Sequence, residues 1–172
     1  MLRRLSLLLS LAFAAPVAAT AQVPVFVAGQ AGGAFTTDEN TPNGTGSGFA
    51  WLGAAGVAFE HLSVGGEYAA YKTGGGGKSE VVGGFARLPT YIGNSPSQLY
   101  LVIGLGAYRF RPPTGKASTT AGGSLGPGIR VAFRGSPVAI LAEVRFHSTF
   151  DKLPRINSQQ FIGLTGGLEL RL

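Results

Sequence analysis

Apolar and polar residues alternate with a period of two along most of this chain. At the end of the chain, for example, Ile162, Leu164, Leu168, Leu170 and Leu172 share one parity, and the residues between them are mostly small or polar. Such a period is typical of a β-strand with two unlike faces. It predicts eight strands, at Val23–Thr36, Ser47–Phe59, Leu62–Lys72, Glu80–Tyr91, Gln98–Phe110, Thr120–Arg134, Pro137–Ser148 and Ser158–Leu172.

Many of these strands have ten or more residues, which is long for a globular protein but natural for a strand that crosses a bilayer at a tilt. Their connections alternate in length. Short links at residues 60–61, 92–97 and 135–136 alternate with longer ones at residues 37–46, 73–79, 111–119 and 151–157. Tight turns at one rim and loops at the other are typical of an up-and-down barrel. We therefore predict an all-β fold, a closed antiparallel transmembrane β-barrel of about eight strands.

The charged residues within the strands show which face is inside. In the seventh strand Glu143, Arg145 and His147 alternate with Val144 and Phe146. An eight-stranded barrel is just wide enough inside for side chains to fill it, and charges buried there should pair. A soluble barrel with an apolar interior is the alternative, which we disfavour because it would place these charges in water. The predicted polar lumen contains Gln30, Glu67, Arg87, Arg130, Glu143, Arg145 and Glu169.

Aromatic residues gather near the strand ends on the opposite face. In outer-membrane barrels, aromatic girdles flank the apolar band at both interfaces. The aromatic residues that we expect at the membrane interfaces are Phe49, Trp51, Phe59, Tyr68, Phe133 and Phe146.

Two segments do not follow the pattern. Both faces of the fifth strand are apolar, and we place Leu101, Ile103 and Leu105 inside with Arg109, so that Tyr100, Val102 and Tyr108 face outward. In the sixth strand, Pro127 cannot donate a hydrogen bond to a β-ladder. We expect either a bulge at this proline or a loop that continues to about Gly128.

The first residues have the features of an export signal. A basic start with Arg3 and Arg4 precedes an apolar run from Leu5 to Ala15 and the small-residue pattern Ala19-Thr20-Ala21. This predicts a cleaved signal peptide at residues 1–21 and a barrel domain at residues 22–172. An uncleaved membrane anchor is the alternative, but the apolar run is short for one. The chain has no cysteine, so disulfides and thiolate metal sites are excluded, and we expect neither a metal nor a cofactor.

One motif suggests chemistry that the surrounding residues do not support. Gly77-Lys78-Ser79 ends like a phosphate-binding loop, but Lys72 stands where its first glycine would be, and a strand follows instead of a helix.

The loops carry more basic than acidic residues. The basic ones are Lys78, Arg111, Lys116, Lys152 and Arg155. We favour ordinary solvated loop charge over contact with lipopolysaccharide phosphates, which is the other interpretation. No basic stripe with interleaved aromatics suggests nucleic acid.

In pattern, the chain resembles the small outer-membrane barrels of the OmpA, OmpX and OmpW type. The ending Thr165-x-Gly167-x-x-Leu170-x-Leu172 is similar to the signal read by the barrel-assembly machinery, although many bacterial members end in Phe. The resemblance implies a location in the outer membrane, contact with its lipid, insertion by that machinery and a monomeric state. The terminal strand would also close the barrel, which removes the open edge that lipid does not tolerate.

Enzymatic barrels are a weaker match. Lipid A deacylases of the PagL type carry His and Ser two residues apart on the outer face, whereas here Thr149 follows His147 and His147 falls on the predicted inner face. Palmitoyltransferases of the PagP type use His, Asp and Ser, and no spacing rule supports His147, Ser148 and Asp151 in those roles. We therefore expect a non-catalytic structural or interaction barrel with a filled lumen. The alternatives are a transport barrel for small solutes and, less favoured, a lipid A-modifying enzyme.

Overall fold

The computed structural model describes residues 24–36, 47–72, 77–150 and 160–172. The signal peptide predicted at residues 1–21 lies outside these residues, as do the loop charges Lys152 and Arg155. No helix in the part of the chain that the structure describes is long and apolar enough to cross a membrane.

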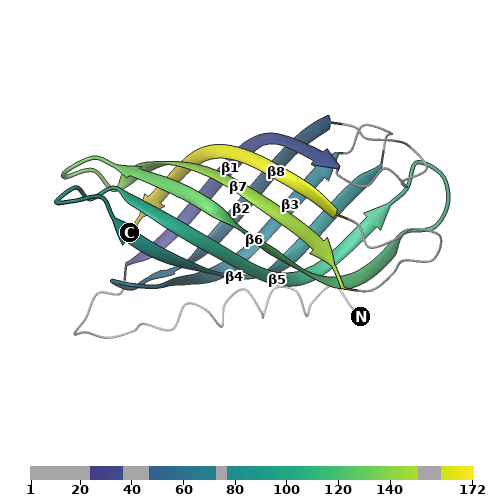
Figure 1. Ribbon diagram of the computed structural model, residues 1–172, viewed down its shortest axis with the longest axis horizontal. Coiled ribbons are helices and arrows are strands. Elements are labelled where there is room, and N and C mark those ends of the chain that lie inside the picture. The colour runs from purple at the N-terminus through teal and green to yellow at the C-terminus, as the bar shows by residue number, and fades with distance from the viewer. Residues whose placement is uncertain (1–23, 37–46, 73–76, 151–159) are drawn as a thin grey trace, which may run out of the picture.

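The described residues form eight strands in one closed barrel (Figure 1). Each strand pairs antiparallel with the next, and β1 pairs with β8. The predicted fold is confirmed, and each strand end lies within two residues of its predicted place. The strands are β1 (Val25–Thr36), β2 (Ser47–Ala58), β3 (Ser63–Lys72), β4 (Lys78–Tyr91), β5 (Gln98–Arg111), β6 (Ser118–Ala132), β7 (Val138–Thr149) and β8 (Gln160–Arg171).

Three tight turns lie at one rim, together with the C-terminus, at the left of Figure 1. Between β2 and β3 the Phe59 N–H donates to the Leu62 carbonyl at 2.7 Å, and between β6 and β7 the Ser136 N–H donates to the Phe133 carbonyl at 3.1 Å. Gly135 has a φ of 76°, a conformation that other residues adopt at a cost, so glycine suits this turn. We call this the turn rim and the opposite one, which holds the β5–β6 connection at residues 112–117, the loop rim.

Alternate residues of every strand point inward, as the sequence predicts for seven of the eight strands. The inward apolar residues form two clusters on the two sides of the barrel centre. The cluster toward the loop rim contains Ala34, Ala50, Leu52, Ala69, Tyr71, Val81, Tyr108 and Phe161. The cluster toward the turn rim contains Phe26, Ala58, Phe85, Tyr100, Val102 and Leu141. The outer wall is apolar, with Val82, Leu105 and Leu168 each 58–64% exposed, which is the surface expected of a protein in lipid.

The predicted facing of β5 is wrong. Tyr100, Val102 and Tyr108 are buried in the lumen, while Leu101, Ile103 and Leu105 are exposed on the outer wall, as is Arg109. Glycines of β6 provide the space: a Cβ on Gly128 would overlap the Tyr100 ring, and a Cβ on Gly122 would come within 2.7 Å of the Tyr108 ring. Polar partners inside the barrel bind both tyrosine hydroxyls, as described below, so burial does not leave them unsatisfied.

The expectation of a bulge or an extended loop at Pro127 is also wrong. Pro127 lies within β6 and keeps its place opposite Leu101 of β5. On the other side, the pairs Leu125↔Phe146 and Gly128↔Glu143 share one register, so no residue is inserted between them. The proline therefore interrupts the β6–β7 ladder locally without shifting the strands.

Close backbone contact at the β1–β8 seam depends on Gly32. A Cβ at this position would overlap the carbonyl oxygen of Leu164 on β8, whereas a Cβ at Gly29 of the same strand would meet nothing within 4 Å. The seam that closes the barrel therefore has room for a side chain at Gly29 and none at Gly32.

We predict that Gly32→Ala lowers the free energy of unfolding by about 1–3 kcal/mol, the usual cost of overpacking. Gly29→Ala should stay within about 0.5 kcal/mol of the unsubstituted protein. Both are measured by urea unfolding in detergent, with chains refolded in vitro so that cellular assembly has no influence. Equal effects of the two substitutions would contradict the assigned seam geometry.

Candidate functional site

The inside of the barrel holds the densest cluster of polar chemistry in the described part of the chain. All seven residues predicted for the lumen point inward, and none exceeds 8% exposure. They come from six strands and are Gln30 (β1), Glu67 (β3), Arg87 (β4), Arg130 (β6), Glu143 and Arg145 (β7) and Glu169 (β8). The six charged residues among them are three acids and three bases.

The first part of this cluster is centred on Arg145. Its Nη1 donates to Glu67 Oε2 at 2.6 Å, and its Nε donates to Glu143 Oε2 at 2.7 Å. One guanidinium therefore bridges two carboxylates on different strands. Each of these ion pairs is buried, so removal of the arginine would take one buried counter-charge from each of two carboxylates in a medium that solvates charge poorly.

The second part is centred on Glu169. Arg87 Nη2 lies 3.1 Å from Glu143 Oε1, and Arg87 Nη1 donates to Glu169 Oε2 at 2.8 Å. Glu169 Oε1 in turn accepts from Arg130 Nε at 2.7 Å and from Arg171 Nε at 2.9 Å. The charges thus alternate in sign along one continuous series, which we call the ion chain: Glu67, Arg145, Glu143, Arg87, Glu169 and Arg130, with Arg171 at the turn rim.

Aromatic rings enclose the middle of the ion chain. The Arg87 guanidinium carbon lies 5.0–5.3 Å from the ring centroids of Phe26, Phe85 and Tyr100, within the range of cation–π attraction. The Tyr100 hydroxyl donates to Glu143 Oε1 at 2.6 Å. These rings therefore both attract the cation and fill the space beside it.

A second polar centre, formed around His147, lies on the loop-rim side of the ion chain. The Tyr71 hydroxyl lies 3.1 Å from Nε2 of His147, and the Tyr108 hydroxyl lies 3.0 Å from Nδ1. The imidazole stacks on Phe161 with a centroid distance of 4.5 Å and an interplanar angle of 8°. His147 is 1% exposed, so both ring nitrogens and one ring face are occupied inside the barrel.

The sequence analysis places His147 on the inner face but includes none of Tyr71, Tyr108 and Phe161 among the predicted lumen residues. Tyr71 and Phe161 share parity with the charged residues of their own strands, Glu67 and Glu169, and this parity is the signal that could have placed them inside. The same rule fails for Tyr100 and Tyr108, because Arg109 has the opposite parity and points outward.

The terminal strand combines inward and outward roles. Of the proposed assembly signal, Thr165 points inward and its hydroxyl donates to Gln30 Oε1 at 2.8 Å, and a Cβ on Gly167 would overlap the carbonyl oxygen of Gly29. Leu170 and Leu172 are 36% and 75% exposed, and the Leu172 N–H donates to the Val25 carbonyl at 2.8 Å. This strand is therefore the closing strand of the barrel, and its role in assembly stays a prediction.

The outward aromatic residues lie toward the two rims. Phe49, Trp51, Tyr68 and Phe146 lie toward the loop rim, and the Trp51 and Tyr68 rings are 5.1 Å apart. At the turn rim, Phe59 and Phe133 are 50% and 52% exposed and lie just beyond the ends of β2 and β6. Exposed aromatic residues that the sequence analysis did not select are Phe35 and Phe150 toward the loop rim and Tyr91 toward the turn rim.

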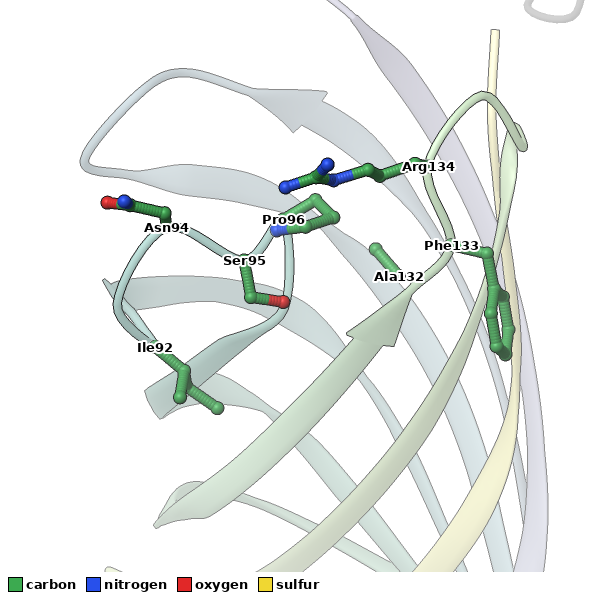
Figure 2. Close-up of a pocket in the computed structure, with 7 residues that line it drawn as sticks. All are labelled: Ile92, Asn94, Ser95, Pro96, Ala132, Phe133 and Arg134. Carbon is green, nitrogen blue, oxygen red and sulfur yellow. The ribbon is translucent and has the colours of Figure 1, made fainter.

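The described structure has grooves at its surface and a very small cavity inside the barrel. Two overlapping grooves of about 580 and 600 Å³ lie at the turn rim. In one of them Arg134 extends over the groove toward Pro96, while Phe133 points away (Figure 2). The cavity beside Arg87, Tyr100 and Glu169 has only about 10 Å³, roughly the space of one water molecule.

Within the described ranges, no three His, Asp or Glu side chains are grouped so that they could hold a metal ion. The lumen also does not present His147 to lipid, as a lipid A deacylase would require. The chemistry that the interior supports is charge pairing and hydrogen bonding among its own side chains.

Comparison with solved structures identifies the fold. Neisserial surface protein A gives a TM-score of 0.73 at 21% identity over 86% of this chain and 97% of its own. The N-terminal β-barrel domain of OprF from Pseudomonas aeruginosa gives 0.64 at 11% identity over 89% of this chain and 100% of its own. A scan against protein-family models and a search of curated proteins gave no match.

The chain has the fold of the small eight-stranded outer-membrane β-barrels, as expected from the sequence. The expected location in the outer membrane agrees with this fold and with the apolar outer wall. In such barrels the short turns face the periplasm and the longer loops face outward.

We predict that Arg145→Ala lowers the free energy of unfolding in detergent by about 3–5 kcal/mol, because Glu67 and Glu143 then lose a buried partner. Arg109→Ala is the matched control, since Arg109 is exposed on the outer wall, and we expect a change within about 0.5 kcal/mol. Urea unfolding measures both. Equal stability of the two variants would mean that the ion chain contributes little to the fold.

Proposed function

We propose that this protein is a non-catalytic, non-conducting barrel of the outer membrane, with a structural or interaction role performed by its outer surface and loops. The observation that carries this proposal is the ion chain, which spans the lumen from β3 to β6 by way of β7, β4 and β8. Contact with outer-membrane lipid, insertion by the assembly machinery and a monomeric state belong to the same proposal.

The lumen packing supports a sealed barrel. The ion chain occupies the turn-rim half and the centre. The packed rings of His147, Phe161, Tyr71 and Tyr108 occupy the loop-rim half. Arg87 and Arg145 each contact two carboxylates across the lumen, which supports a lumen without a wide aqueous path. A solute would have to break several buried charge pairs to pass.

Transport through the wall is the second candidate, and its only support in the sequence was the apolar character of both faces of β5. That support is weaker in the structure, because the apolar inward residues of β5 are accounted for by lumen packing. The β4–β5 ladder is also continuous from Lys78↔Arg111 to Tyr91↔Gln98, which leaves no lateral opening beside this strand.

We predict that the reconstituted protein shows no conductance steps in planar bilayers. The double variant Glu143→Ser, Arg145→Ser removes one charge of each sign from the middle of the ion chain and should give small, measurable steps. A Glu60→Ser, Arg134→Ser variant, which makes the same charge change at the turn rim, should remain silent. Large steps from the unsubstituted protein would rule out a sealed lumen.

The absence of catalysis has its own test. The hydrogen bonds to both nitrogens of His147 and its burial leave it without access to a lipid acyl chain. We expect lipid A mass spectra from cells with and without the protein to be the same. The appearance of a deacylated or acylated lipid A species that depends on the protein would show that it is an enzyme.

A further inference from the structure

The largest surplus of positive charge on the described outer wall lies at the loop rim of β3, β4 and β5. We define the outer cationic patch as Lys72, Lys78, Arg109 and Arg111, with Glu80 among them. All five have outward parity on their strands. We propose that this patch binds the phosphate groups of lipid A in the outer leaflet of the membrane.

The strand register brings the cations together. Lys72 pairs with Lys78, and Lys78 pairs with Arg111, so three cations form one row across three strands. One step down toward the membrane, Glu80 pairs with Arg109. Directly opposed residues in an antiparallel ladder are about 4.5–5.5 Å apart. Such a row of like charges is unfavourable by itself, and an anion placed over it would remove that cost.

The single carboxylate of the patch neutralises only part of this charge. Glu80 Oε1 accepts from Lys78 Nζ at 2.9 Å, and Glu80 Oε2 accepts from Arg111 Nη2 at 3.0 Å. Lys72 and Arg109 make no ion pair with a described acidic residue, although Arg109 lies opposite Glu80 in the β4–β5 ladder. The patch therefore keeps two unpaired cations beside a fixed three-residue cluster, a surface that attracts a multiply charged anion.

The outer cationic patch lies at the level of the lipid headgroups, above the apolar wall of the barrel. Val82, 58% exposed on the apolar wall, lies four residues below Lys78 on the same strand. Four residues span about 13 Å along a strand, or about 10 Å of height at the usual tilt of 35–45°. Tyr68 pairs with Val82 across the β3–β4 ladder; its ring packs on Trp51, and its hydroxyl reaches up to donate to Glu80 Oε1 at 3.3 Å. The cations therefore lie just above an aromatic girdle.

The wall below the patch distinguishes a membrane lipid from a soluble anion. Val82 and Leu105, at 58% and 64% exposure, offer an apolar surface directly beneath the cations. Lipid A combines phosphate groups with acyl chains, so a single molecule satisfies both surfaces. A free phosphate ion would use only the upper one.

The test uses Trp51, which is the one tryptophan of the chain and lies beside the patch. Its fluorescence is followed while phosphorylated lipid A is added to the folded full chain in detergent. The double variant Lys72→Gln, Arg109→Gln removes the two unpaired cations and leaves the Glu80 cluster intact. Each basic residue near a membrane surface contributes about 1 kcal/mol to binding of an anionic lipid. We therefore expect the double variant to bind lipid A about 30-fold more weakly than the unsubstituted protein.

The control is Lys116→Gln, Arg134→Gln, which removes two cations outside the patch and should change the affinity less than twofold. Both variants must show the heat-dependent gel shift of a folded barrel. Dephosphorylated lipid A should bind the unsubstituted protein as weakly as lipid A binds the patch variant, and inorganic phosphate should leave the fluorescence unchanged.

Three results would overturn the proposal. The first is equal binding of lipid A by the patch variant and the unsubstituted protein. The second is equal binding of phosphatidylglycerol, which would make the patch a general contact for anionic lipids. The third is displacement of lipid A by inorganic phosphate. None of these results bears on conductance, so the proposal can fail while the sealed lumen stands.

Discussion

Closure of the sheet is the constraint on which the rest of this structure depends. In lipid, every backbone N–H and C=O must find a partner within the protein, so the edge of β1 has to meet the edge of β8. With eight strands, closure leaves an interior only wide enough for side chains. The contents of the lumen are therefore a packing problem, and every charge placed there must find its counter-charge within a few ångströms.

The ion chain solves this problem by alternating acid and base. Arg145 bridges Glu67 and Glu143, and Arg87 bridges Glu143 and Glu169. Because most members have two partners, the cost of removing each charge from water is offset by more than one ion pair. The arrangement also ties together strands that are distant in sequence. Burial of these charges costs more than burial of apolar residues would, so the net stabilisation by the ion chain is smaller than its number of ion pairs suggests.

Glycine is the second requirement of a narrow lumen. The long tyrosine side chains fit inside because the facing positions have no Cβ: Gly128 lies beside Tyr100, and Gly122 lies beside Tyr108. This explains why sequence reasoning located the strands and the seven polar lumen residues but not the facing of β5. The alternation of apolar and polar residues describes one strand at a time, whereas the inward position of Tyr100 depends on a glycine in β6 and on Glu143 in β7. The expectation at Pro127 is wrong for a related reason. The proline interrupts the β6–β7 ladder locally and leaves the β5–β6 ladder intact, which the sequence of one strand does not reveal.

The same residue types have opposite roles on the two sides of the wall. Inside, the three acids of the ion chain face its three buried bases, Arg87, Arg130 and Arg145, and the buried charge is balanced within the protein. On the outer wall at the loop rim, four bases surround one acid, and the balance has to come from elsewhere. In the sealed barrel that we propose, the chemistry available to partners is at the outer surface. In our proposal, lipid A supplies the missing negative charge, because the cations of the outer cationic patch lie at headgroup height above an apolar wall.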